Sequence, residues 1–389
     1  MISVAIIRGL GLNKYEMQSY EPLSKDFRIT AISTYNHDFE IKEINLPIRK
    51  LHCLEEVIIP LPFFAKKYAY YFMQNLWGKS FYLFGLEKKI KNFDIIHAVE
   101  TYQAYSYQAI QCKKKYGNKV VVTVWQNLPF IYEKHPIKRK IKREVRNNTD
   151  LFIAVTKRAK ETLILEGVSP NKIKVILPGV DLEKFSHREK SSPLLKKIGL
   201  DKNDFVIVFV GRLSRSKGVY ELLFAIQRIL NDPDLSRYSI KVLINGQGSE
   251  ENELREFIRN LKMNKNFKLL GFTPYNEIKK LYNIADIVIV PSIITKLWQE
   301  QFGYVLVEAM ASGKAVVSTL SGSIPEVLGD AGILAQPNDY LSLYRELKKI
   351  ILNADLRTKL GQKARKRAET LFDAQKTAVK IAEAYNSLF

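Results

Sequence analysis

The sequence holds 389 residues, 46% of them hydrophobic and 26% charged, which is enough for two folded domains and excludes a wholly disordered chain. A net charge of +21 favours partners that carry phosphate, such as nucleic acid, a phosphorylated lipid or an anionic bilayer, and residues 1–180 hold 29 Lys and Arg against 16 Asp and Glu. No apolar run reaches the roughly 18 residues of a membrane-spanning helix, and the two distant cysteines, Cys53 and Cys112, exclude a disulfide framework and indicate a reducing compartment.

The chain begins with a short β-like segment. Met1 is followed directly by Ile2–Ile7, which is too short for the apolar part of a secretory signal and has no basic segment before it. We therefore expect a cytoplasmic protein, with the inner face of the cell membrane as an additional location suggested by the basic and aromatic segments below.

Short apolar runs alternate with longer helical patterns in the first half, which is typical of parallel βαβ units. Because such sheets bind ligands beyond the carboxyl ends of their strands, the residues that follow each strand are the candidates for a site. The predicted strands are Ser3–Ile7, Ile29–Ser33, Ile95–Ala98, Val120–Val124, Leu151–Val155 and Ile173–Leu177.

Two glycines, Gly9 and Gly11, follow the first predicted strand. Glycine allows the backbone to approach a phosphate or a sugar closely. Position 14 is Lys where a dinucleotide-binding fingerprint has its third glycine, so the pattern does not indicate NAD binding. Spacing alone equally fits a plain turn from strand to helix.

Two segments of the first half combine aromatic and basic residues. Phe63–Phe84 holds ten aromatic residues in 22, and Lys134–Arg146 holds seven basic residues and one acid. In the second segment Ile137, Ile141 and Val145 recur every four residues, which predicts a helix with one apolar face and basic residues around the rest. This composition suits either the headgroup region of a membrane or a buried aromatic core beside a solvated helix.

The pattern changes near Pro178 and Gly179, which break regular structure and precede a polar stretch, His187–Pro193. We predict one domain over residues 1–185 and a second over 186–374. The strands predicted in the second half are Phe205–Val210, Ile240–Ile244, Lys268–Leu270, Ile287–Val290, Ala315–Ser318 and Ile333–Leu334. The tail, Ala354–Phe389, reads as two helices.

Two carboxylates bracket a turn in the most informative stretch, residues 298–310. Glu300 precedes Phe302-Gly303, and Glu308 lies on a helix predicted over Tyr304–Ala311. The start of a helix offers free N–H groups and a partial positive charge, which suit a phosphate. A nucleotide-sugar fits this layout, and so does a short loop before a helix whose Glu308 is merely solvated.

Glu300 and Glu308, with seven residues between them, resemble the E-x7-E signature of glycosyltransferase family four. The resemblance covers nearly the whole chain and is specific in the C-terminal half and looser in the N-terminal half. Its other motifs, in order, are Leu177–Asp181, Val210–Gly218, Gly246–Gly248, Gly271–Pro274, Ala285-Asp286, Val290–Ser292, Ser312–Val317 and Ser321–Glu326.

The resemblance implies the GT-B plan, an α/β fold in which two Rossmann-like doubly wound domains face each other across a cleft. It implies an acceptor-side N-terminal domain, a donor-binding C-terminal domain and a last helix, about 375–389, that packs back on the first. It further implies a retaining transferase that moves a hexose from a nucleotide-diphosphate sugar to a glycan, such as one linked to polyprenyl phosphate.

Residue roles follow from the same resemblance. Arg212 and Lys217, after the strand Phe205–Val210, would neutralise the donor diphosphate. Glu308 would accept hydrogen bonds from the ribose, and Glu300 would position the transferred sugar. The remaining donor contacts implied are Gly9, Gly11, Phe302, Gly303, Tyr304 and Val305.

One departure from the family lies after the strand Val120–Val124, where many relatives carry a histidine. Trp125, Gln126 and Asn127 stand there instead. Neither amide acts as a base at neutral pH, but both can hydrogen-bond hydroxyls, so Gln126 and Asn127 are candidates for contacts with the reacting sugar. His97, at the end of a neighbouring strand, is either an alternative contact or a structural residue.

No metal or other cofactor is expected. Asp232-Pro-Asp234 imitates a D-x-D metal motif, but it lies in an ordinary loop with turn chemistry. The alternative functions are a glycogen-synthase-like polymerase, a nucleotide-sugar epimerase, or a basic protein that binds nucleic acid or membrane. The basic residues are spread along the chain without a nucleic-acid-binding motif, so we expect no nucleic-acid partner.

Overall fold

The computed structural model describes residues 1–36, 39–58, 62, 65, 68–69, 82–188, 190 and 192–389. The chain divides into two compact units: unit 1 comprises Met1–Gly179 with Ala374–Phe389, and unit 2 comprises Val180–Asp373. The chain enters and leaves unit 2 at adjacent positions, because the Val180 N–H donates to the Phe372 carbonyl oxygen at 2.7 Å. The division thus falls between Gly179 and Val180, whereas the sequence pattern placed it between residues 185 and 186.

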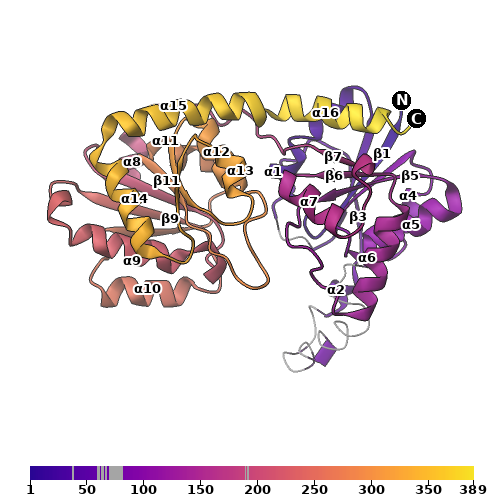
Figure 1. Ribbon diagram of the computed structural model, residues 1–389, viewed down its shortest axis with the longest axis horizontal. Coiled ribbons are helices and arrows are strands. Elements are labelled where there is room, and N and C mark those ends of the chain that lie inside the picture. Colours follow the sequence, from indigo (N-terminus) through magenta and orange to yellow (C-terminus); the bar gives the residue numbers. More distant parts are fainter. Residues whose placement is uncertain are drawn as a thin grey trace. The chain divides into compact units, whose positions relative to one another are not determined.

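Unit 1 is built on a seven-stranded parallel sheet with the order β3-β2-β1-β4-β5-β6-β7. In Figure 1 its residues are coloured indigo to magenta, apart from the last helix in yellow. The order reverses between β1 and β4, so this pair marks the topological switch point at which open α/β sheets bind ligands. The strands are β1 (Ser3–Gly9), β2 (Arg28–Thr34), β3 (Ile48–Leu51), β4 (Ile95–Val99), β5 (Lys119–Val124), β6 (Leu151–Ala154) and β7 (Ile173–Val175).

Both faces of this sheet are buried because successive side chains of a strand point to opposite sides. In β1, Ala5 and Ile7 join one apolar cluster, and Val4 and Ile6 join another. The helices of unit 1 are α1 (Lys14–Met17), α2 (Leu54–Ile58), α4 (Leu86–Ile90), α5 (Ala104–Tyr116), α6 (Pro136–Asn148), α7 (Lys157–Leu165) and α16 (Ala374–Asn386).

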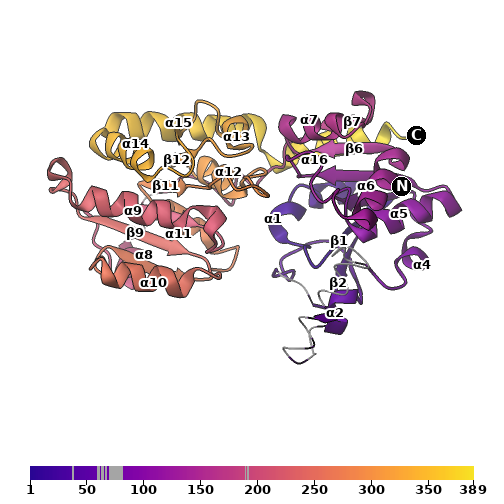
Figure 2. The same ribbon diagram turned by 60° about the horizontal axis from the view of Figure 1, so that its bottom comes forward.

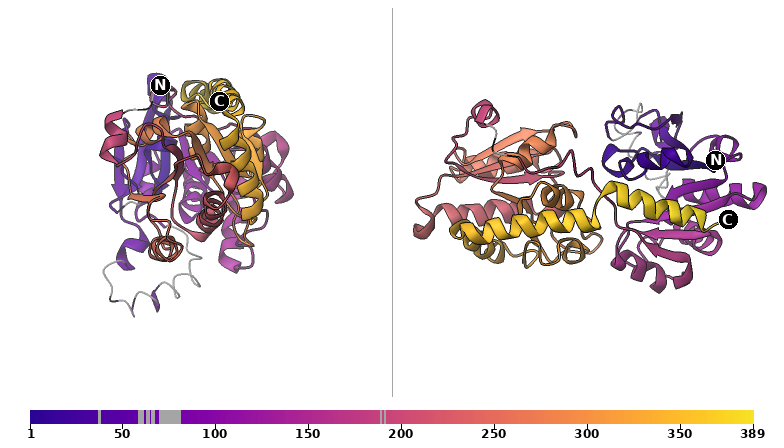
Figure 3. Two further views of the ribbon diagram at one scale, coloured as in Figure 1. Left: turned by 90° about the vertical axis from the view of Figure 1, so that its left-hand side faces the viewer. Right: turned by 90° about the horizontal axis from the view of Figure 1, so that it is seen from above.

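Helix α16, the last of the chain, lies against the sheet of unit 1 (Figure 3). Its buried residues Ala378, Ile381, Ala384 and Tyr385 belong to the same apolar cluster as Val4 and Ile6. The C-terminal residues therefore complete one face of the core that the N-terminal strand begins.

Unit 2 contains a six-stranded parallel sheet with the order β10-β9-β8-β11-β12-β13, and helices lie on both sides of it (Figure 2). Its switch point lies between β8 and β11. The strands are β8 (Phe205–Val210), β9 (Ile240–Asn245), β10 (Phe267–Gly271), β11 (Ile287–Val290), β12 (Ala315–Thr319) and β13 (Ile333–Ala335). The helices are α8 (Ser192–Lys197), α9 (Val219–Leu230), α10 (Glu251–Asn260), α11 (Ile278–Ile284), α12 (Tyr304–Ala311), α13 (Ile324–Leu328), α14 (Tyr340–Leu352) and α15 (Ala354–Leu371).

All twelve strands predicted from the sequence are present, and the predicted fold class, two Rossmann-like α/β domains, is confirmed. The sequence analysis missed one strand, β3. It is a four-residue edge strand whose two central residues, Arg49 and Lys50, are exposed. Charged residues on a short edge strand discourage pairing with other chains, and they also remove the apolar pattern by which a strand is recognised.

Within the described part of the chain, no helix is long and apolar enough to cross a bilayer. The predicted basic helix is present as α6, with Ile141 and Val145 buried and Ile137 packed against the same core. Most of the aromatic segment Phe63–Phe84 lies outside the described residues.

Candidate active site

The loop after β8 brings Lys217 to the switch point of unit 2. The backbone turns at Gly218, which has a φ of +70°, and a Cβ atom there would lie 1.8 Å from the Pro291 carbonyl oxygen. Only glycine therefore allows this turn to pack against the chain leaving β11. The consequence is that Lys217 reaches the loop between β11 and α12, which carries Glu300.

Lys217 and Glu300 form an ion pair. The Lys217 Nζ atom lies 2.7 Å from Glu300 Oε2, and the Ser292 hydroxyl donates to the same oxygen at 2.7 Å. The Lys217 ammonium also lies 4.8 Å from the centre of the Trp298 ring. Glu300 is buried, and a cation and a hydroxyl donor hold its carboxylate in place.

The turn after β12 supports the backbone of Glu300. The Ser323 N–H donates to the Glu300 carbonyl oxygen at 2.9 Å, and the Glu300 N–H donates to the Ser321 hydroxyl at 3.3 Å. Gly322, with a φ of +56°, lies between them, and a Cβ atom on it would come within 2.0 Å of the same carbonyl oxygen. The loops after β8, β11 and β12 are thus joined around Glu300.

Helix α12 starts at the end of this loop, with Gly303 as its N-cap in the left-handed region at a φ of +85°. Phe302 is buried, and its ring packs edge-on against Phe372 and Tyr304 at 5.9 and 5.3 Å between ring centres. Phe302 therefore anchors the start of the helix, whose first N–H groups, including those of Tyr304 and Val305, carry the partial positive charge of the helix dipole.

Glu308 lies on α12 and is buried, so it is not the solvated helix residue of the alternative interpretation. The Tyr282 hydroxyl donates to Glu308 Oε2 at 2.6 Å. Burial raises the pKa of Glu308, while hydrogen bonds from Tyr282 and Tyr275 and the charge of Lys184 oppose this rise. Glu308 is a desolvated hydrogen-bond acceptor that already has hydroxyl partners.

Arg212 follows β8 and is exposed, and its guanidinium has no hydrogen-bond or ion-pair partner among the described residues. The neighbouring Arg215 differs, because it forms a two-pronged ion pair with Glu221 at 2.6 and 2.7 Å. Arg212 is therefore the cation of this loop that can receive an anion without breaking an existing pair.

In unit 1 the glycine loop after β1 is a short turn into α1. Gly9 is in the left-handed region with a φ of +55°, and the Gly11 N–H donates to the Arg8 carbonyl oxygen at 3.1 Å. Asn13 caps α1, because its side chain accepts from the Glu16 N–H at 2.8 Å. The turn thus has a structural explanation that requires no ligand.

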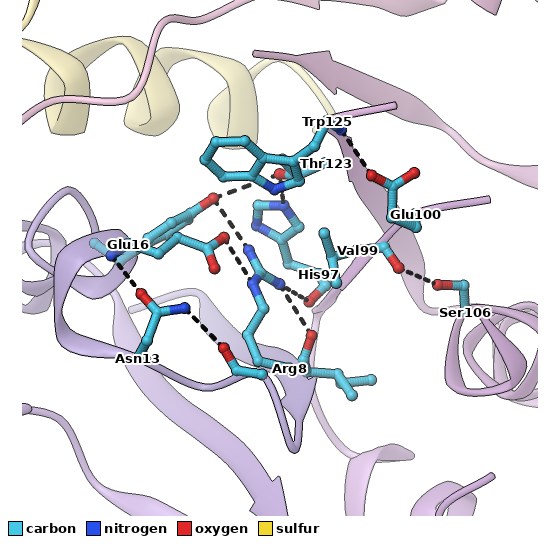
Figure 4. Close-up of polar contacts among 12 residues, drawn as sticks. Arg8, Asn13, Glu16, His97, Val99, Glu100, Ser106, Thr123 and Trp125 are labelled. Carbon is cyan, nitrogen blue, oxygen red and sulfur yellow. Dashed lines mark hydrogen bonds and ion pairs between the residues drawn. The ribbon is translucent and has the colours of Figure 1, made fainter. Parts of the chain in front are cut away.

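A buried polar network lies beneath this turn (Figure 4). The Arg8 guanidinium donates to Glu16 at 2.8 Å, and His97 lies between the hydroxyls of Tyr385 and Thr123 at 2.6 and 2.7 Å. Burial, followed by the charge of Arg8, holds the pKa of His97 well below its usual value. His97 is thus a neutral structural residue that links α16 to the sheet.

The residues at the position of the missing histidine are held by a carboxylate. The backbone N–H groups of Trp125 and Gln126 donate to Glu100 Oε1 at 2.9 and 3.1 Å. The Gln126 side-chain oxygen accepts from the N–H groups of Asn127 and Leu128, both at 2.9 Å. Gln126 and Asn127 are both buried. The side-chain oxygen of Gln126 is therefore already used as a hydrogen-bond acceptor within this turn.

The sequence analysis did not identify Glu100. It follows β4 in the left-handed region, with a φ of +62°, and is 5% exposed. Burial raises its pKa from an ordinary 4.5 to about 7, although the N–H groups of Trp125 and Gln126 and the charge of Lys142 oppose the rise. The available signal was a single charged residue directly after an apolar strand, which occurs in many structural turns.

Within the described residues, no group of three or more His, Cys, Asp or Glu side chains could hold a metal ion. The two carboxylates of the D-x-D imitation, Asp232 and Asp234, both contact the Lys348 ammonium, at 2.8 and 2.6 Å. Both carboxylates are therefore already paired with one cation of the chain.

Models of two glycosyltransferase families match successive parts of the chain. A family model described as glycosyl transferases group 1 matches residues 191–367, and a model described as glycosyltransferase family 4 matches residues 47–184. The first lies within unit 2, and the second lies mainly in unit 1.

Among curated relatives, a D-inositol 3-phosphate glycosyltransferase of Corynebacterium jeikeium is 30% identical over 66% of this chain and 62% of its own length. The spore coat protein SA of Bacillus subtilis is 26% identical over 77% of this chain and 80% of its own length. The chain spans 62%, 52% and 44% of the lengths of the first three relatives.

Among solved structures, Anabaena HepE in complex with UDP superimposes with a TM-score of 0.78 at 20% identity, and the match covers all of both chains. This likeness shows the GT-B fold. Since the two family models together account for most of the chain and match it in the expected order, the chain belongs to glycosyltransferase family four.

Proposed function

We propose that this protein is a retaining glycosyltransferase that transfers a hexose from a nucleotide-diphosphate sugar to a lipid-linked or other glycan acceptor. The observation that carries the proposal is the junction at the switch point of unit 2, where Lys217 and Glu300 meet beside the N-terminus of α12. A cation, an anchored carboxylate and the positive end of a helix dipole at one switch point suit a sugar diphosphate.

The proposed donor site assigns the diphosphate to Arg212, Lys217 and the first N–H groups of α12. In the free protein Lys217 is paired with Glu300, so an incoming diphosphate competes for the same ammonium. Arg212 has no such partner among the described residues and can bind first. Negative charge that develops on the departing diphosphate is then stabilised by donors that are already in place.

Two carboxylates would bind the rest of the donor. Glu308 is buried and accepts from Tyr282, and it would accept hydrogen bonds from the ribose hydroxyls. Glu300 would orient the hydroxyls of the transferred sugar while Ser292 and Lys217 hold its carboxylate. Glu300 acts in this proposal through position and charge, and no metal is required.

The acceptor side of the proposal includes contact with an anionic membrane. Helix α6 packs one apolar face on unit 1, and its residues Arg139, Lys140 and Arg143 are exposed, as is Lys134 just before it. A row of exposed cations attracts acidic headgroups, which would place unit 1 beside a lipid-linked acceptor.

The first test is calorimetric titration of the full chain with UDP, GDP and ADP, without added metal. Tight binding of one nucleoside diphosphate, weakened by Lys217→Ala and Glu308→Ala, supports the donor site. UDP is the first probe because HepE was solved with UDP and with UDP-glucose. Absence of binding by all three nucleotides would contradict the proposal, and products of many sugar units instead of one would favour the polymerase alternative.

A further inference from the structure

Two donors share one oxygen of Glu300, and they differ in how easily they can leave it. The Ser292 hydroxyl and the Lys217 ammonium each lie 2.7 Å from Glu300 Oε2. Ser292 is fully buried, whereas the Lys217 side chain is 26% exposed and consists of a flexible four-carbon stem that ends in the charge. The ammonium can therefore move toward a ligand, while the hydroxyl stays where the backbone of Ser292 holds it.

Hydroxyl groups of the neighbouring strand fix the backbone on both sides of Ser292. Residues 290–293 leave the carboxyl end of β11, and three of their carbonyl oxygens accept from side chains of β12 and of the turn after it. The donors and acceptors are Ser318 to Val290 at 2.6 Å, Thr319 to Ser292, and Ser321 to Ile293 at 3.2 Å. The position of the Ser292 hydroxyl is thus set by bonds to the sheet and needs no contribution from Lys217.

The loop after β8 contacts the same segment. The Ile293 N–H donates to the Ser216 carbonyl oxygen at 3.0 Å, one residue before Lys217. Strands β8 and β12 are the two neighbours of β11, so residues 290–293 are held from both sides. Because the backbones at Ser292 and Lys217 are fixed relative to each other, the Lys217 side chain is the part of this junction that can exchange partners by rotation.

A diphosphate that binds Lys217 draws the ammonium away from Glu300. While the ammonium is present, its charge offsets that of the carboxylate, which makes Oε2 a weaker acceptor for the second donor. The hydrogen bond from Ser292 therefore strengthens when Lys217 leaves. Without that hydroxyl, the departure of Lys217 would leave a buried carboxylate with one donor fewer, which is costly.

We propose that Ser292 is a positioning residue of the donor site, which keeps the Glu300 carboxylate in place while the diphosphate takes over Lys217. The inference rests on the proposed function and adds a step to it, the exchange of the Lys217 ammonium between a carboxylate of the chain and the diphosphate of the donor. Ser292 is fully buried and acts on the donor only through Glu300.

The experiment is a double-mutant cycle of Ser292→Ala and Glu300→Gln, measured by calorimetric titration of the full chain with UDP, GDP, ADP and inorganic pyrophosphate. Glu300→Gln removes the charge that holds Lys217, so diphosphate binding should tighten by about threefold or more. Ser292→Ala removes the donor that remains after Lys217 has left, so binding should weaken by about three- to tenfold. The two substitutions thus change the affinity in opposite directions.

The coupling between the two substitutions distinguishes positioning from a general disturbance of the loop. In the Glu300→Gln background there is no ion pair for the diphosphate to break, so adding Ser292→Ala should change the affinity by less than about twofold. A merely structural role of Ser292 would weaken binding by the same factor in both backgrounds. Ser292→Cys, which replaces the hydroxyl by a weak donor, enters the same cycle if Ser292→Ala does not fold.

Ser239→Ala is the matched control. The Ser239 hydroxyl donates to the Asp204 carboxylate at 2.6 Å, so the same kind of hydrogen bond is removed from the same unit. Asp204 precedes β8 and Ser239 precedes β9, which places this pair at the amino end of the sheet, away from the loops of the switch point. Diphosphate affinity should equal that of the parent, and circular dichroism checks the fold of every variant.

Three results overturn the inference: Ser292→Ala leaves diphosphate binding unchanged, it weakens binding equally in both backgrounds, or Glu300→Gln does not tighten binding. The proposed function fails by a different result. A chain that binds pyrophosphate with the expected coupling but binds none of the three nucleosides' diphosphates supports the exchange at Lys217 and contradicts the proposed function. A chain that binds a nucleoside diphosphate without coupling does the reverse, and a chain that binds no diphosphate overturns both.

Discussion

The two units carry the same kind of parallel sheet, but they assemble its carboxyl edge by different means. In unit 2, glycines let backbone segments approach each other. A Cβ atom added at Gly246 would lie 1.8 Å from the Gly211 carbonyl oxygen, and one added at Gly248 would lie 2.1 Å from the Leu213 carbonyl oxygen. A Cβ atom added at Gly322 would lie 2.0 Å from the Glu300 carbonyl oxygen. In unit 1, side chains from distant positions hold the edge, with Lys142, Glu166 and Glu133 around one turn. A required glycine is visible in a sequence as a motif, whereas an ion pair between distant residues is not.

The largest effect is expected from the ion cluster of unit 1. Lys142→Ala removes a cation that is almost fully buried and leaves Glu166 without its closest partner, so the free energy of unfolding of unit 1 should fall by roughly 3–5 kcal/mol. Lys280→Ala, which removes an exposed pair with Glu277, should cost less than about 0.5 kcal/mol. Denaturant unfolding measures both, and equal small losses would show that the edge of unit 1 does not depend on its ions.

The glycine contacts of unit 2 give the next effect. Gly322→Ala adds a Cβ atom against the Glu300 backbone and imposes left-handed strain, so it should destabilise unit 2 by roughly 2–5 kcal/mol. Gly85→Ala in unit 1 has a similar φ of +70° but open space around its Cβ atom, and it should cost only the strain, about 1–2 kcal/mol. Equal losses of thermal stability in the two variants would refute the role assigned to the close approach.

Glu100 links the stability of unit 1 to pH. Burial raises its pKa from an ordinary 4.5 to about 7, so Glu100 ionises at a lower pH in the unfolded chain than in the folded chain. The contribution of the protonated carboxyl to folding stability is therefore complete below pH 4.5 and is lost as pH rises through about 7. Relative to Glu100→Gln, the parent should gain on the order of 3 kcal/mol as pH falls through this window. Chemical denaturation at a series of pH values tests this, and a constant difference between parent and variant would contradict it.

The smallest effect separates two cations of unit 2. Arg212→Ala and Lys217→Ala should each weaken nucleoside diphosphate binding by about tenfold, since each removes a charge-assisted contact. Only Lys217→Ala should also lower the stability of unit 2, because Lys217 is paired with the buried Glu300 and Arg212 is exposed. Calorimetry and thermal unfolding of both variants decide this, and equal stabilities would mean that the Lys217–Glu300 pair contributes nothing to folding.

Much of the fold was predictable because buried parallel strands are continuous apolar runs. The strands at Phe205–Val210 and Ile287–Val290 and the helix at Tyr304–Ala311 match the prediction residue for residue. The short edge strand β3 was not predictable, since its charged residues carry no such run.

In unit 2 the sequence singled out candidate residues, but it did not indicate their contacts. Glu300, Lys217 and Glu308 were singled out from their motifs, yet no spacing indicated that Lys217 and Glu300 lie 2.7 Å apart or that Tyr282 donates to Glu308. In unit 1 the sequence left His97 open between a sugar contact and a structural residue, and the structure favours the structural role, because its ring bonds to Tyr385, 288 positions further along.

The sequence by itself determined the alternation of strands and helices, the positions of the glycines and the family, because these depend on local pattern and on residue types at short spacing. Only the tertiary structure decided which charges are paired, which side chains are buried, and that Glu100 accepts hydrogen bonds from the N–H groups of Trp125 and Gln126. The physical reason is distance: an ion pair or a hydrogen bond acts over a few ångströms in space, and the residues that form it in unit 1 lie tens of positions apart in the chain.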